Sequence, residues 1–173
     1  VRLLQMVSLY RGGELVKMGK RTGESVTLNE LMEEVGTDAA RYFFLMRALD
    51  SQLDFDRDLA KKKSNDNPVY YIQYAHARIC SIFCKLQEKG TQFNGCTKEQ
   101  AQSLTDDEEK ELIRYISSLT NEVENAAKLL DPSKRTRYAV ELATLFHKFY
   151  NACRCDTDVK DLAAARLFLC RCT

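Results

Sequence analysis

A basic, glycine-containing segment near the start of the chain is the first candidate for chemistry. Residues 17–23 read KMGKRTG, so Lys17 and Lys20 place two ammonium groups on a loop with Arg21 beside them. Such a loop could close on a polyphosphate and stabilise the charge that grows on it in a transition state, a task that suits lysine as a compact charge on a long stem. The spacing alone favours the simpler interpretation of a solvated basic turn, because the segment is not a P-loop.

Two tyrosines and an arginine form the second candidate. Tyr71, Tyr74 and Arg78 recur at helical spacing, so they share one face of the expected helix, away from the middle of its apolar stripe. Aromatic rings and a guanidinium in a row can stack unpaired bases and hold a phosphate or a base edge. The tyrosines could equally pack inside a helix bundle with their hydroxyls outward. The run Lys61–Lys63 lies just upstream and could contact a nucleic-acid backbone, although a bare charge run is more often a solvated face.

The cysteines and histidines indicate neither a metal centre nor a catalytic set. The seven cysteines are odd in number and follow no secretion signal, which indicates reduced thiols in a cytoplasm. Segments 153–155 and 170–172 both read CRC rather than the C-x2-C of zinc knuckles, so buried or surface thiols are favoured and no metal is expected. His76 falls on the apolar stripe of its expected helix and is interpreted as a core residue. His147 lies opposite the stripe of its own helix, and no Ser-His-Asp set or pair of catalytic carboxylates accompanies either.

Periodicity predicts a mainly helical chain in three parts. Residues 1–24 are expected to hold a short β hairpin, with strands at 3–9 and 15–16, followed by the basic loop. Residues 25–64 are expected to form a small helical connector, and residues 65–173 an antiparallel helix bundle with short loops.

Capping residues and glycines place the individual helices. In the connector, a Thr27–Glu30 capping box and Gly36 bound a helix over 28–35. A second helix is expected at about 38–49, followed by an extended piece at 53–56. The bundle is expected to contain a helix from Pro68 to about 89, a helical stretch from a Thr105–Glu108 capping box to 130 that can break near 117–120, a helix from Pro132 to about 153, and a last helix from 157 or 158.

Length and composition exclude several classes of protein. The chain has 173 residues, 45% apolar residues and a net charge of +1, so it is neither disordered nor a strongly basic, histone-like protein. No apolar run approaches the roughly 18 residues of a membrane span, and Arg2 and Arg11 interrupt the first apolar stretch, which argues against a signal peptide. The first residue is Val1 rather than methionine, and we expect a piece of a longer protein.

Three blocks of this sequence closely resemble the C-terminal half of class I arginyl-tRNA synthetases. Residues 17–23 are similar to the K-M-S-K-S signature loop, which by itself identifies only class I. Residues 35–47 and 53–56 are similar to the connector that contacts the tRNA stem. Residues 65–78 resemble the opening of the anticodon-binding bundle and are specific to the arginine enzyme, and residues 149–154 fit the same bundle.

The resemblance implies an enzyme that activates arginine with ATP and Mg²⁺ and transfers it to its tRNA in the cytoplasm. Lys17, Met18, Gly19 and Lys20 would bind ATP, and the two lysines would stabilise the pyrophosphate leaving group. Gly19 stands where the family usually has serine, which removes one hydroxyl donor. Tyr74 and Arg78 match positions that contact the anticodon, with Tyr71 as a neighbour.

The same resemblance sets the expected limits of the chain. The H-I-G-H signature and the arginine pocket would lie before Val1, so this chain alone is expected to bind no cofactor and to be inactive, and it is expected to be a monomer. A fragment of a cysteine or methionine synthetase, which share the loop and connector, is one alternative. A non-catalytic helical RNA-binding module is the other, and it leaves the basic loop without a role.

Overall fold

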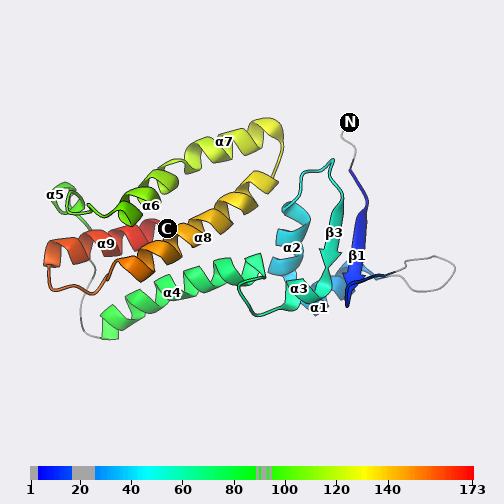
Figure 1. The fold of residues 1–173 in the computed structure, drawn as a ribbon, viewed down its shortest axis with the longest axis horizontal. Coiled ribbons are helices and arrows are strands. Elements are labelled where there is room, and N and C mark those ends of the chain that lie inside the picture. Colours follow the sequence, from blue (N-terminus) through cyan, green and yellow to red (C-terminus); the bar gives the residue numbers. More distant parts are fainter. Residues whose placement is uncertain (1–3, 17–25, 89, 91–92, 94) are drawn as a thin grey trace. The chain divides into compact units, whose positions relative to one another are not determined.

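The computed structural model describes residues 4–16, 26–88, 90, 93 and 95–173 (Figure 1). The chain divides into two compact units, one formed by residues 1–71 and 123–137 and the other by residues 72–122 and 138–173. Strands occur only near the start of the described chain, and helices account for most of the rest, which confirms the predicted mainly helical fold class. The three-part division at residues 24 and 64 stays a prediction.

A small sheet opens the first unit. Strand β1 (Val7–Arg11) pairs antiparallel with β2 (Glu14–Leu15), and Gly12 and Gly13 between them take positive φ angles of 60° and 78°, which only glycine adopts readily. This is the predicted hairpin. Strand β3 (Leu53–Asp56) is the predicted extended piece, and it pairs in parallel with β1, beside which it runs in Figure 1.

Three helices complete the core of the first unit. They are α1 (Leu28–Val35), α2 (Thr37–Leu45) and α3 (Arg57–Lys61). Gly36 ends α1 as predicted, with φ of 84° and its N–H donating to the Met32 carbonyl. Helix α2 is shorter than the predicted 38–49. The buried core between helices and sheet consists of Leu9, Leu31, Ala39, Phe43, Phe55, Ala60 and Val69.

The N-terminus of α1 has the predicted capping box. The Thr27 hydroxyl accepts from the Glu30 N–H at 3.2 Å, and a Glu30 carboxylate oxygen accepts from the Thr27 N–H at 2.7 Å. We expect Thr27→Ala to lower the free energy of unfolding by about 1 kcal/mol, because an N–H of the first turn loses its acceptor. Urea denaturation followed by circular dichroism measures this. Thr27→Ser, which keeps the hydroxyl, should stay near wild type, and an equal loss in both variants would contradict the capping role.

Three cations of the first unit surround the Glu34 carboxylate. The Arg57 guanidinium contacts one oxygen, and Arg11 Nη2 and Lys61 Nζ approach the other at 3.2 and 2.8 Å. Arg57 is only 6% exposed, and burial, together with the neighbouring Arg11 charge, lowers its pKa. Glu34 therefore links β1, α1 and α3.

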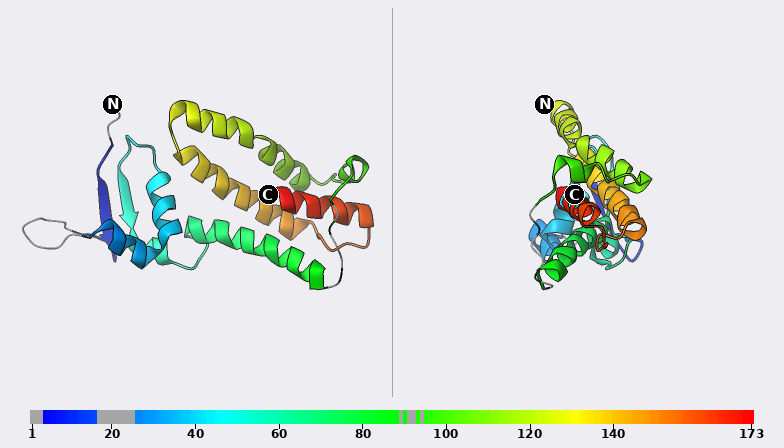
Figure 2. Two further views of the ribbon diagram at one scale, coloured as in Figure 1. Left: turned by 180° about the vertical axis from the view of Figure 1, so that it is seen from behind. Right: turned by 90° about the vertical axis from the view of Figure 1, so that its left-hand side faces the viewer.

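Helices form the second unit and also the parts of the first unit at residues 68–71 and 123–137. The helices after the connector are α4 (Pro68–Glu88), α5 (Lys98–Ala101), α6 (Asp107–Ser117), α7 (Leu119–Leu129), α8 (Ser133–Ala152) and α9 (Lys160–Cys172). The predicted break near residues 117–120 falls between α6 and α7. Figure 2 shows α8 and α9 from two further sides, and ring and ion-pair contacts join α6 to both of them.

Aromatic residues of α8 form the core of the second unit. Phe146 and Phe149 are fully buried, and Leu145 and Tyr138 are nearly so. The Tyr138 ring stacks on Tyr115 of α6 at 4.6 Å between centroids. Among the described residues no helix combines the length and apolar character that crossing a membrane requires.

Three predictions about this unit are wrong in detail. His76 is exposed rather than in the core, because the buried face of α4 is centred on Ala75; its ring lies near the Cys80 thiol one turn later. The capping box of α6 consists of Asp106 and Glu109 rather than Thr105 and Glu108. Glu109 is fully buried and forms an ion pair with Arg166. Helix α9 begins at Lys160 rather than 157 or 158.

Candidate nucleic-acid interface

Four side chains from α4 and α8 gather into one stacked group, which we call the aromatic–arginine cluster: Tyr74, Arg78, His147 and Tyr150. The first two lie one helical turn apart on α4 and the last two nearly one turn apart on α8. Side chains at these spacings share a helix face, so each helix presents a pair to the other.

Arg78 is the centre of the cluster. Its guanidinium carbon lies 4.7 Å from the centroid of the Tyr74 ring and 4.6 Å from that of the Tyr150 ring. Arg78 Nη2 also donates to the Tyr74 hydroxyl at 2.6 Å. Cation–π contacts of this kind are attractive and hold the planar guanidinium between the two rings. Both rings therefore contact the same planar, cationic group.

His147 forms the buried side of the cluster. Its ring centroid lies 5.6 Å from that of Tyr74 with an interplanar angle of 31°, and it is 9% exposed. Arg78 Nη1 donates to His147 Nδ1 at 3.4 Å. A guanidinium has no acceptor, so this bond requires Nδ1 of His147 to be unprotonated.

Exposure decides what the cluster can contact. Tyr74 is 40% exposed, which is high for a large aromatic side chain, while Arg78 and Tyr150 are half-buried. Stacking an unpaired base needs such an accessible ring held in a fixed orientation. The Tyr74 hydroxyl accepts from Arg78, which fixes the orientation of the exposed ring.

The structure joins two of the three residues predicted for this face. Tyr74 and Arg78 are in direct contact, and α8 supplies the other two members of the cluster. Tyr71 is half-buried three residues before Tyr74 and is not one of the four clustered residues. His147 and Tyr150 were not predicted; the available signal was their near-turn spacing on α8, next to the 149–154 block that fits the bundle.

The predicted phosphate-binding loop lies elsewhere in the chain. Lys17, Met18, Gly19 and Lys20 fall outside the described residues, so their roles stay predictions.

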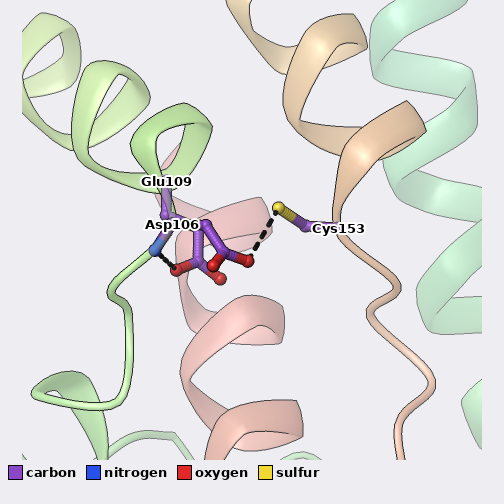
Figure 3. A group of neighbouring side chains, drawn as sticks. All are labelled: Asp106, Glu109 and Cys153. Atoms are coloured by element: carbon purple, nitrogen blue, oxygen red, sulfur yellow. Dashed lines mark hydrogen bonds between the residues drawn. The ribbon is translucent and has the colours of Figure 1, made fainter.

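A second polar group, Asp106, Glu109 and Cys153, has the residue types of a metal site (Figure 3). One ligand atom from each lies within 4.8 Å of the others. The Arg166 guanidinium already bonds both carboxylates, at 2.8 Å to Asp106 and 2.6 Å to Glu109. Burial raises the pKa of Cys153 to about 11, and its thiol donates to Asp106. A cation would have to displace Arg166, so the group is a salt-bridge network in which Glu109 is buried and Asp106 is exposed.

A model of the DALR anticodon binding domain matches residues 72–173. The chain belongs to this family. The match covers all of the second unit, and therefore all four residues of the aromatic–arginine cluster.

Relatives of this family member include arginine–tRNA ligases. That of Ruminiclostridium cellulolyticum is 51% identical over 173 residues, which is 100% of this chain and 31% of the relative. That of Heliobacterium modesticaldum is 54% identical over 173 residues, which is 98% of this chain and 31% of the relative. A crystal structure from Campylobacter jejuni, assigned as an arginyl-tRNA synthetase, superposes with a TM-score of 0.84 at 35% identity over 98% of this chain and 36% of its own.

These findings confirm the resemblance to the arginine enzyme that the three sequence blocks indicated. The chain spans about a third of the length of the curated relatives it matches. The relatives named here are arginine–tRNA ligases or an arginyl-tRNA synthetase, so they do not support the alternative of a cysteine or methionine synthetase.

Proposed function

We propose that this chain is the tRNA-recognising C-terminal part of an arginine–tRNA ligase, and that the aromatic–arginine cluster contacts unpaired bases of the anticodon arm. The observation that carries this proposal is Arg78 held between two tyrosine rings, one of them 40% exposed, inside the part of the chain that matches an anticodon binding domain. Sequence-specific RNA recognition targets unpaired bases that stack on aromatic rings and guanidinium planes.

Each residue of the cluster has a distinct proposed role. Tyr74 offers the accessible face on which a base stacks. Arg78 supplies positive charge and donors for a base edge or phosphate, and its two ring contacts limit where that charge can lie. His147 and Tyr150 position Arg78 from α8. Tyr71 is proposed as a neighbouring contact one turn earlier on α4.

The ligation reaction is proposed for the whole protein. It would use L-arginine, ATP with Mg²⁺ and the arginine tRNA, with Lys17 and Lys20 holding the ATP phosphates alongside Met18 and Gly19. The relatives' names support this proposal, and the signature-like loop agrees with it. We further propose a monomeric protein acting in the cytoplasm, where translation takes place and where the seven free thiols stay reduced.

Binding of arginine tRNA to Tyr74 variants tests the proposal. We expect Tyr74→Ala to weaken binding by about 1–3 kcal/mol, or roughly 5- to 150-fold, because alanine removes the stacking face. Tyr74→Phe keeps the ring and should lose far less. Fluorescence anisotropy at fixed, moderate salt measures the affinities, since charge contacts alone make affinity depend steeply on salt.

Arginine variants separate stacking from charge. Arg78→Lys keeps the positive charge but loses the planar group, so we expect clearly weaker binding. Arg114→Lys on the exposed surface of α6 is the matched control and should bind as wild type. Unchanged binding in both Tyr74→Ala and Arg78→Lys, with unchanged circular dichroism, would rule out the cluster as the RNA contact and favour a helical module with another role.

A further inference from the structure

Two thiols of the second unit lie in contact without being bonded. Cys155 is in the irregular segment 153–159 between α8 and α9, and Cys170 is near the end of α9. Their sulfurs are 3.6 Å apart. A disulfide has a sulfur–sulfur distance of about 2.05 Å, so closing this pair needs a movement of roughly 1.5 Å. Cys155 is outside any helix and can make that movement without breaking one. We propose that Cys155 and Cys170 form a peroxide-sensitive dithiol that closes to an intramolecular disulfide.

Access differs between the two sulfurs. Cys155 is half-buried and lines two cavities, of about 290 and 750 Å³, whereas Cys170 is 1% exposed. A small oxidant can therefore reach Cys155 first. Cys170 is shielded from it and lies where it can attack the oxidised neighbour.

The surroundings give the two thiols different acidities. The Cys170 thiol donates a hydrogen bond that lowers the pKa of Cys155, against the effect of burial, and the Arg166 charge lowers it further. The same hydrogen bond and burial raise the pKa of Cys170. The thiolate is the nucleophilic form, so Cys155 is the attacking group and Cys170 keeps its proton until the second step.

The reaction balances with hydrogen peroxide as the oxidant. The Cys155 thiolate attacks one peroxide oxygen, the O–O bond breaks, and the leaving hydroxide takes a proton to become water. Cys155 is then a sulfenic acid. The Cys170 sulfur attacks Cys155 Sγ, the S–O bond breaks, and the departing oxygen leaves as a second water with the Cys170 proton. Two electrons pass from the two thiols to the peroxide, and one disulfide forms.

Two other thiols lie in settings that do not favour this reaction, and two more are exposed competitors. Cys153 is 2% exposed, donates to Asp106 and has its pKa raised to about 11 by burial. Burial also raises the pKa of Cys96, whose thiol donates to the Thr97 carbonyl. Cys80 and Cys84 are exposed and lie one turn apart on α4, which makes them the competing pair that an experiment must distinguish.

The sequence lets a single digest resolve the neighbouring thiols. Trypsin cuts after lysine and arginine, so Cys153, Cys155, Cys170 and Cys172 fall on the separate peptides 149–154, 155–160, 167–171 and 172–173. The chain is treated with hydrogen peroxide under native conditions, its remaining thiols are alkylated, and the peptides are identified by mass spectrometry. We expect peptides 155–160 and 167–171 to be joined, at least about tenfold more abundantly than any other linked pair.

Serine variants and a denatured control complete the test. Cys170→Ser should abolish the link and let the Cys155 sulfenic acid accumulate, while Cys96→Ser, which changes a thiol lining one of the same cavities, should leave the link unchanged. In guanidinium chloride, wild-type chain should give mixed pairs. Three results on the wild-type chain would overturn the proposal: a dominant link through Cys153 or Cys172, oxidation of Cys80 and Cys84 before Cys155, or an equally selective link in the denatured chain. None of these measurements depends on a variant that folds.

Discussion

Replacing Arg166 by methionine should lower the free energy of unfolding by about 3–5 kcal/mol, because it leaves buried carboxylate charge without its partner. Glu109 is fully buried, and Arg166, at 8% exposure, bonds it at 2.6 Å. The same guanidinium bonds Asp106 and donates to the Arg154 carbonyl at 2.9 Å, so it ties α6 to α9 and to the segment before α9. Urea denaturation monitored by circular dichroism measures the loss.

Two further variants identify the cause of that loss. Lys110→Met removes a charge from the exposed side of the same helix α6 and should cost less than about 1 kcal/mol, since surface pairs contribute little. Glu109→Leu combined with Arg166→Met removes the main buried pair together and should recover part of the stability. An Arg166→Met variant no less stable than Lys110→Met would show that the ion pairs of Arg166 with Asp106 and Glu109 contribute nothing to the fold.

Phe55→Ala should lower the free energy of unfolding by a similar amount, about 3–5 kcal/mol. Phe55 is fully buried on β3, and its ring lies 5.3 Å from Phe43 and 5.4 Å from Phe44 of α2. Alanine would remove the centre of the contact between sheet and helix and leave a cavity that the parallel pairing of β1 and β3 cannot easily close.

Phe44→Ala is the matched control for this core position. Phe44 is 36% exposed, so about a third of it stays in water and its loss should cost less, about 1–2 kcal/mol. Denaturation curves of both variants against wild type give the comparison. Equal losses for the two phenylalanines would mean that Phe55 is not the centre of the core that its burial indicates.

Local signals in the sequence predicted the helices well. Gly36, the Thr27–Glu30 box and the break between α6 and α7 follow from caps and glycines that act within a few residues. The one-residue error at Asp106 has a tertiary cause, because the correct capping pair is the one whose Glu109 meets Arg166 from more than fifty residues away. The parallel pairing of β1 with β3 is likewise a long-range contact that no local pattern specifies.

The candidate site divides along the same line. Tyr74 and Arg78 could be found because they lie one turn apart on a single helix. The spacing of His147 and Tyr150 places them on one face of α8, but it does not show that this face meets Arg78, which lies 69 residues before His147. His76 shows how a local pattern can also mislead. The apolar stripe predicted His76 in the core, but the buried residue is its neighbour Ala75 and His76 is exposed.

The central claim, that this chain reads the anticodon through Tyr74 and Arg78, is tested most directly by a double-mutant cycle. The affinities of wild type and Tyr74→Ala are measured for arginine tRNA and for the same tRNA with its middle anticodon base changed. We predict that wild type discriminates between the two tRNAs by about 1–3 kcal/mol and that Tyr74→Ala loses this discrimination. Binding that ignores the anticodon in wild type and falls steeply with salt, or a base preference that Tyr74→Ala retains in full, would contradict the account.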